Sequence, residues 1–135
     1  MSGFAHVDTS VLVRYLVDDA PRMAARATRL LESEETLIVS EVALAETAFV
    51  LEKVYHHDRS SIVEALSRII LRNNVRLLNL EKTLAFRALQ MCGPSRRVSF
   101  ADAIVWALAR TAEAGTVYTF DRRFPQEGID SQGPP

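Results

Sequence analysis

HVDTSVLVRYLVDDA, residues 6–20, places a carboxylate where an apolar strand passes into an amphipathic helix. Val7 ends a short apolar run, Asp8 interrupts it, and apolar residues then recur at helical spacing from Val11 and Leu12 onward. Aspartate is a favoured helix N-cap, and a strand-end carboxylate can also be a metal ligand. The stretch therefore predicts a strand followed at once by a helix, and it leaves both interpretations of Asp8 open.

The alternation of strand and helix continues along the chain. We expect strands at 5–7, 36–40, 75–79 and 116–120, and helices at 10–17, 21–33, 41–54, 61–73, 81–91 and 99–114. Short apolar strands alternating with helices are typical of an α/β fold with a mainly parallel sheet. The sequence predicts one α/β domain over residues 1–125, with a central sheet of four to five strands flanked by helices. We expect residues 126–135 to form a flexible tail.

Several helix starts carry capping residues. Ser40 precedes the helix 41–54, and Ser99 stands three residues before Asp102. Ser61 and Glu64 have the spacing of a capping box, which predicts that they open the helix 61–73.

Bulk properties are those of an ordinary soluble domain. The chain has 135 residues, a net charge of −1, and 16 basic residues of which only Lys53 and Lys82 are lysines. No apolar run reaches the ~18 residues that a membrane span needs, and the single Cys92 excludes an internal disulfide. A cytoplasmic protein without membrane contact is the simplest expectation.

Four acids are candidates for chemistry. Asp8 and Asp121 follow apolar strands, so either is also explained as a cap or a turn residue. Asp102 fits a capping box but belongs to the apolar segment FADAIVWALA. Glu46 lies in the middle of SEVALAETAFVL, where no cap role is available and its helical neighbours are apolar, so we expect it to be functional.

These acids can converge at one edge of a parallel sheet, where ligands bind in open α/β folds. Clustered carboxylates repel one another without a cation, and Mg²⁺ or Mn²⁺ prefers such oxygen ligands. A site of this kind can activate water and stabilise charge on a phosphate. The pattern favours metal-dependent phosphodiester hydrolysis.

Other chemistries have little support. The chain has no GxxxxGK[ST], GxGxxG or GxSxG motif. His6, His56 and His57 lack zinc-ligand spacing, and we expect Cys92 to be a helix-end thiol without chemistry. A phosphoacceptor receiver domain would need a strand-end lysine, and neither lysine is placed for that role.

The segments VDTSVLVRYL, SEVALAETAFVL, SFADAIVWALA and VYTFD resemble, in order and spacing, the four acidic blocks of the PIN-domain ribonucleases, and above all the VapC-type toxins. The resemblance covers residues 5 to 125. It implies a PIN-like α/β/α sandwich, a Mg²⁺- or Mn²⁺-dependent endoribonuclease activity, a homodimer, and a cognate antitoxin that inserts a segment into the active-site groove. It also implies an RNA substrate.

Carried over onto this chain, the resemblance makes Asp8, Glu46, Asp102 and Asp121 the acidic quartet. The first, third and fourth would hold the metal, and Glu46 would act directly or through water. Thr119 matches a small hydroxyl residue before the last acid, Ser10 stands where the family often has asparagine, and Ser99 replaces a further acid. This replacement leaves open whether one metal ion or two are bound.

RNA affinity would depend on local arginines, because the net charge is close to zero. The candidates are Arg96, Arg97, Arg122 and Arg123. A PIN-like scaffold or RNA-binding protein without catalysis is the alternative hypothesis.

Overall fold

A computed structural model describes residues 4–112 and 115–135. Along the chain the elements are β1 (Phe4–His6), α1 (Thr9–Leu16), α2 (Pro21–Leu31), β2 (Thr36–Val39), α3 (Glu41–Lys53), α4 (Arg59–Ile70), β3 (Val75–Leu77), α5 (Lys82–Met91), α6 (Phe100–Thr111), β4 (Thr116–Tyr118) and β5 (Asp130–Gln132). The last two residues of the predicted helix 99–114 lie outside the described residues.

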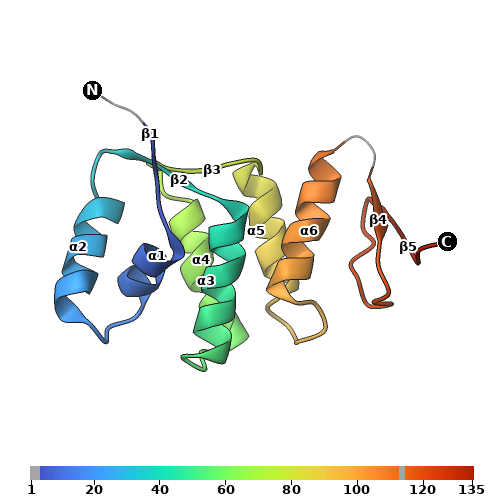
Figure 1. Cartoon of the computed structure of the whole chain (residues 1–135), viewed down its shortest axis with the longest axis horizontal. Helices are drawn as coiled ribbons and strands as arrows, with labels where there is room; N and C mark the ends of the chain where they lie inside the picture. The colour runs from blue at the N-terminus through green and yellow to red at the C-terminus, as the bar shows by residue number, and fades with distance from the viewer. Residues whose placement is uncertain (1–3, 113–114) are drawn as a thin grey trace.

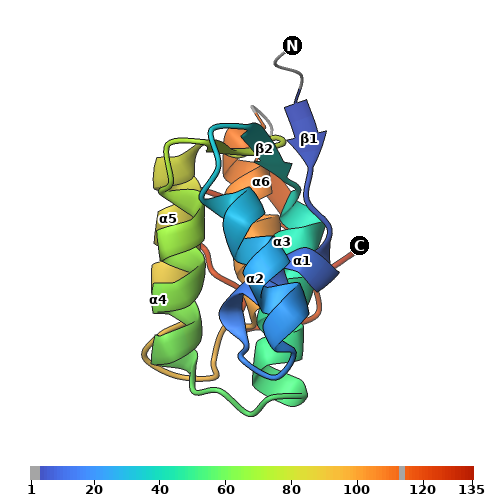
Figure 2. The same cartoon turned by 90° about the vertical axis from the view of Figure 1, so that its left-hand side faces the viewer.

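The first three strands form one parallel sheet in the order β1-β2-β3. Ala5 pairs with Leu37, and Leu37 pairs with Val75 on the other side. Figure 1 shows the helices extending below these short strands. In Figure 2, α4 and α5 lie on the opposite side of the molecule from α1 and α3. The predicted α/β class and the parallel pairing are confirmed.

The prediction of one central sheet with four to five strands is wrong, because the described strands form two separate sheets. β4 pairs in parallel with β5 in a separate two-stranded sheet, which lies beyond α6 from the other strands (Figure 1). Trp106 Nε1 donates a hydrogen bond of 2.8 Å to the Glu127 carbonyl, and Phe124 is buried, so this segment is held against α6. The segment 126–135 that was expected to be a flexible tail therefore includes β5, whose polar sequence DSQ carries no apolar strand signal.

The core is built from one face of each helix together with β2 and β3. The largest side chains that are fully buried include Trp106, Leu12, Leu37, Leu66 and Ile70, which come from α6, α1, β2 and α4. No helix among residues 4–112 and 115–135 is long and apolar enough to cross a membrane.

Two of the predicted caps are confirmed. Ser40 Oγ accepts from the Ala43 amide at 3.1 Å, and Ser99 Oγ accepts from the Asp102 amide at 3.0 Å. The predicted start of the helix at Ser61 is wrong, because Asp58 is the N-cap of α4 and its Oδ1 accepts from the Ser61 amide at 2.8 Å. Aspartate and serine are comparable caps, so the helix begins at the earlier of the two.

Glu41, in the first turn of α3, is a buried carboxylate with three hydrogen-bond donors. It is 5% exposed and accepts from the Asn79 amide at 2.9 Å, the Asn79 side chain at 3.0 Å and the Leu80 amide at 3.0 Å. Burial raises its pKa, but these donors outweigh that effect and lower the pKa of Glu41 below its usual 4.5. Glu41 thereby joins the start of α3 to the connection between β3 and α5.

We expect Glu41→Gln to lower the free energy of unfolding at pH 7 by about 2 kcal/mol, because charge-assisted hydrogen bonds are lost in a buried site. The folded-state pKa of Glu41 is lowered, so its contribution is present above pH 4.5 and fades as the pH falls through the folded value. Urea unfolding at pH 7 and at pH 3 measures both effects. The control Glu64→Gln, at an exposed glutamate, should change little; equal losses in both variants would contradict this role of Glu41.

Candidate functional site

Two of the predicted acids, Asp8 and Glu46, line one open pocket of about 360 Å³. Asp8 is the N-cap of α1, and its Oδ2 accepts hydrogen bonds from Ser10 Oγ at 2.8 Å and from the Ser10 amide at 3.3 Å. Both bonds lower the pKa of Asp8, and the bond from the hydroxyl has the larger effect. The carboxylate is therefore ionised at neutral pH, and Ser10, also predicted for the site, fixes its position.

Glu46 lies on the exposed face of α3, so the expectation of apolar surroundings is only half right. Its helical neighbours Val42 and Phe49 are apolar but 77% and 59% exposed. The helix buries its opposite face, which includes Leu44 and Thr47, and its buried acid is Glu41 rather than Glu46. The carboxylate of Glu46 therefore carries little desolvation cost and is open to a ligand.

Asp102 lies in the first turn of α6 and is half-buried. The helical face that it begins is mixed, because Val105 is 45% exposed and Trp106 is fully buried. Cys92 Sγ, at the end of α5, donates to the Ser99 carbonyl at 3.8 Å, which places the start of α6 near that end. It does not line the pocket of Asp8 and Glu46.

Asp121 follows β4 in the separate sheet. Its amide donates to Thr119 Oγ1 at 3.0 Å, so the predicted supporting residue Thr119 shapes the turn that carries it. Its Oδ1 accepts from the Arg123 amide at 2.8 Å and lies 3.7 Å from Arg123 Nε. Local contacts hold this carboxylate, and it does not line the pocket of Asp8 and Glu46 either.

The four acids are therefore not gathered into one metal site in this arrangement. Within the ranges 4–112 and 115–135, no three His, Cys, Asp or Glu side chains lie close enough together to hold a metal ion. Asp8 and Glu46 supply two carboxylates, and Mg²⁺ in proteins is commonly bound through one or two carboxylates, with waters and substrate phosphates completing its shell. These two residues therefore fit such an ion only together with water or phosphate, and the joint role of the four acids stays a prediction.

Three of the arginines predicted to bind RNA lie together elsewhere. Arg97, Arg122 and Arg123 line a pocket of about 430 Å³, between the loop that precedes α6 and the turn that follows β4. Arg96 is exposed in the same loop. This pocket contains neither Asp8 nor Glu46.

Arg14 and Tyr55 line the pocket of Asp8 and Glu46, and sequence analysis missed both. A signal existed for Arg14, because it stands four residues after Ser10 and so lies on the same face of α1. No local pattern marks Tyr55, which reaches the pocket from the turn after α3. These side chains bring a cation and an aromatic ring to the two carboxylates.

Arg59 holds the loop that leads into α6. Its Nε lies 2.8 Å from Glu52 Oε2 in a largely buried ion pair, and its Nη1 donates to the carbonyls of Cys92, Ser95 and Val98. The guanidinium also lies over the ring of Phe100, 5.0 Å from the centroid. Arg59 thus fixes the backbone immediately before Asp102.

We expect Arg59→Lys to keep the fold but loosen residues 95–99, because an ammonium cannot reproduce the planar fork of donors. Each lost hydrogen bond is worth about 1 kcal/mol, so amide exchange in this loop should become several-fold faster. Hydrogen exchange read by mass spectrometry measures it. Arg68→Lys, at an exposed ion pair of the same helix, is the control; unchanged exchange in Arg59→Lys would refute the assignment.

Cys92 is buried, and burial raises the pKa of its thiol to about 12. The thiol is therefore protonated at neutral pH and a poor nucleophile. Cys92 is the C-cap of α5, which confirms its predicted place at a helix end.

Comparisons with known proteins place this geometry in a family. The family model described as "PIN domain" matches residues 5–128. Among solved structures, the chain is similar to a crystal structure of VapC20 from Mycobacterium tuberculosis, described as a sarcin–ricin loop cleaving toxin, with 23% identity and a TM-score of 0.45 over 98% of this chain and 100% of that one. No curated protein matches.

Proposed function

The chain belongs to the PIN domain family, and from this premise we propose that it is a metal-dependent endoribonuclease that acts as the toxin of a toxin–antitoxin pair. Membership of the family supports a nuclease that hydrolyses RNA. The observation that carries the proposal is the pocket in which Asp8 and Glu46 lie together, because it joins the first two acidic blocks of the chain in space.

In the proposed reaction, a water molecule attacks phosphorus, the bond to the 3′ oxygen breaks, and this oxygen takes up a proton from solvent, which leaves a 3′ hydroxyl and a 5′ phosphate. A proton must leave the attacking water, and an ionised carboxylate at the pocket can accept it or orient the water. Asp8 and Glu46 are the groups that we assign to this task. Ser10 keeps the Asp8 carboxylate in a fixed rotamer through its two hydrogen bonds.

Mg²⁺ or Mn²⁺ dependence is the finer part of the proposal. Its support is chemical, since a phosphodiester carries negative charge and two carboxylates in one pocket repel it without a cation. A divalent ion would supply Lewis-acid stabilisation of the phosphate. We assign no step to the ion, because the described residues alone do not complete its ligand shell.

We expect Asp8→Asn to fold normally and to lose RNA cleavage by about 100-fold or more, as general acid–base groups contribute on that scale. Asparagine retains an oxygen that accepts from Ser10 and is as good an N-cap as aspartate, so α1 should persist. Cleavage of a labelled RNA and the melting temperature are the measurements.

The matched control is Asp58→Asn, which changes the N-cap of α4 in the same way outside the pocket. This control should keep both fold and cleavage. Full activity in Asp8→Asn, with contaminating nuclease excluded, would refute the assignment.

The alternative is a PIN-like scaffold or RNA-binding protein without catalysis, and the separation of Asp121 from the pocket of Asp8 and Glu46 favours it. The two functions differ in their response to metal. An enzyme should lose cleavage on chelation and melt at a higher temperature with Mn²⁺, since binding to the native state stabilises it. A scaffold should show neither response.

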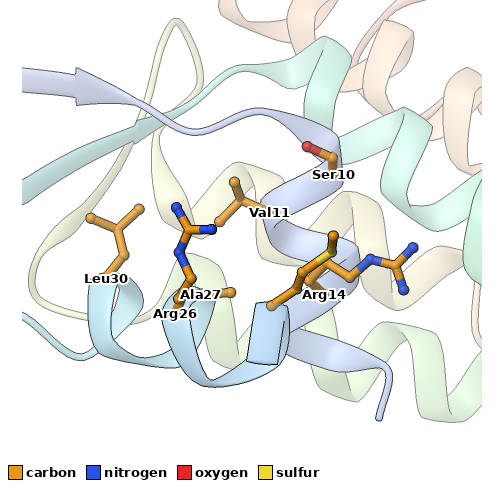
Figure 3. Close-up of a pocket in the computed structure, with 7 residues that line it drawn as sticks. Ser10, Val11, Arg14, Arg26, Ala27 and Leu30 are labelled. Atoms are coloured by element: carbon orange, nitrogen blue, oxygen red, sulfur yellow. The ribbon is translucent and has the colours of Figure 1, made fainter. Parts of the chain in front are cut away.

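A cognate antitoxin is the partner that this function needs, and the groove between α1 and α2 is the surface that we propose for it. The groove measures about 620 Å³, and its walls include Val11, Ala27 and Leu30, with Arg14 and Arg26 at the rim. Figure 3 shows Val11 and Arg14 on α1 across from Arg26, Ala27 and Leu30 on α2. An apolar floor with a basic rim suits an amphipathic helix that carries acidic residues.

We expect Met23→Glu to weaken antitoxin binding about tenfold or more, because a charge would enter the apolar part of the groove, and central interface residues are worth over 1 kcal/mol. Leu71→Glu alters a residue of similar exposure at the end of α4, outside the α1–α2 groove. Titration calorimetry with the purified antitoxin compares them. Loss in Leu71→Glu alone would move the interface to α4. The predicted homodimer stays a prediction.

A further inference from the structure

Asp19, in the turn between α1 and α2, contacts two side chains that line the pocket of Asp8 and Glu46. Its Oδ1 lies 2.5 Å from Arg14 Nη1, and its Oδ2 accepts a hydrogen bond of 2.9 Å from the Tyr55 hydroxyl. One carboxylate therefore fixes a cation from α1 and an aromatic ring from the turn after α3. Both side chains line the pocket that contains Asp8 and Glu46.

The backbone around Tyr55 is also fixed. Its amide donates to the Val50 carbonyl at 3.2 Å, and the His57 amide donates to the Leu51 carbonyl at 3.0 Å. Between them His56 has a φ of 57°, the left-handed conformation that ends many helices. The ring thus starts from a well-defined turn and is held at its other end by Asp19.

Arg14 brings a positive charge to this pocket. Of the described residues that line it, Arg14 alone is cationic, and Asp8 and Glu46 are anionic. A guanidinium carries five N–H donors, and the bond from Nη1 to Asp19 leaves Nη2 and Nε as donors for a phosphate. The side chain is 33% exposed, so these donors can reach a ligand from solvent.

Tyr55 offers an apolar face beside that cation. It is half-buried, and its ring lies 6.2 Å from that of His57 at an angle of 53°. Bases of single-stranded RNA stack on such rings without regard to sequence. A phosphate donor and a stacking ring, held by one carboxylate, are the two elements that recognise a nucleotide.

We propose that Arg14 and Tyr55 form an RNA subsite, in which Arg14 binds a phosphate next to the scissile one and Tyr55 stacks on a base. Asp19 is the positioning residue for both. This inference rests on the proposed function, because it names how the same pocket holds its RNA. It assigns substrate contact to Arg14 and Tyr55 rather than only to the four arginines predicted from the sequence.

The test measures binding without cleavage. Asp8→Asn is introduced into every protein, and a short fluorescent single-stranded RNA is titrated by anisotropy over a series of salt concentrations. Adding Arg14→Gln should raise Kd about tenfold and reduce the slope of log Kd against log salt by about 0.7, the value for one phosphate contact on a single strand. A role in folding alone would not change the salt slope.

Arg68→Gln, in the same background, is the matched control. It removes an exposed arginine that pairs with Glu64 four residues away, outside the pocket of Asp8 and Glu46. Kd and salt slope should stay as in the parent. Arg14→Lys serves as the second variant if glutamine lowers the melting temperature, and it should restore the slope while Kd stays raised, because lysine keeps the charge and loses the fork.

Tyr55 is tested by two substitutions in the same assay. Tyr55→Phe keeps the ring and loses the bond to Asp19, so Kd should rise only a few-fold. Tyr55→Leu removes the stacking face and should raise Kd about tenfold or more. Neither change should alter the salt slope.

The outcomes separate this subsite from the proposed function. The protein with native Asp8 is also assayed for cleavage. If it fails to cleave RNA but Arg14 and Tyr55 affect binding as expected, the nuclease function is refuted and the RNA subsite stands. Equal Kd and slope in Arg14→Gln and Arg68→Gln would overturn the subsite. The subsite would also be overturned if Arg14→Gln weakened antitoxin binding and left RNA binding unchanged, since Arg14 also lines the α1–α2 groove.

Discussion

The buried ion pair between Arg59 and Glu52 organises the helical half of this protein. Glu52 comes from α3 and Arg59 from the first turn of α4, and the same guanidinium contacts the end of α5 and the start of α6. Removing charges from water is costly, and hydrogen bonds to all the free donors are what make such a pair tolerable. Here backbone carbonyls of the loop before α6 accept from Nη1, so the loop and the pair need each other.

The aspartates of the candidate site are positioned by contacts with residues close to them in sequence. Asp8 is held by Ser10, and Asp121 by its neighbours Thr119 and Arg123. Asp102 receives its position from the Ser99 cap and, further back, from Arg59. Asp8 and Asp121 thus each have hydrogen-bond donors among their own neighbours, and Asp102 is fixed through its backbone at the start of α6. Of the four acids, Asp8 and Glu46 line one pocket.

Sequence reasoning succeeded where the signal was local. Strand and helix positions, the parallel pairing and the caps at Ser40 and Ser99 depend on short apolar runs and on residues a few positions apart. It failed where the answer lay in tertiary contacts. The mid-helix position of Glu46 drew attention to it, but the helix sequence does not reveal that Glu46 is exposed and that Glu41 receives its donors from residues 79 and 80.

The same limit explains the other differences. β5 has a polar sequence and exists because it pairs with β4, which lies against α6 rather than in the main sheet. Tyr55 enters the site from a distant turn through a single hydrogen bond to Asp19. Periodicity cannot foresee a contact of this kind, since it depends on how separate elements meet in space.

The linear order of the pocket residues has a consequence for protein synthesis. Asp8, Arg14, Glu46 and Tyr55 of the pocket all precede residue 56, as does the positioning residue Asp19, whereas Asp102 and the core residue Trp106 follow much later. At about 5–20 residues per second, a ribosome needs several seconds to pass from one group to the other. A nascent chain thus carries every RNA-contacting residue proposed for the pocket before it has the side chain that closes its core. A copy that ends before Trp106 lacks the packing that this buried side chain supplies to the core.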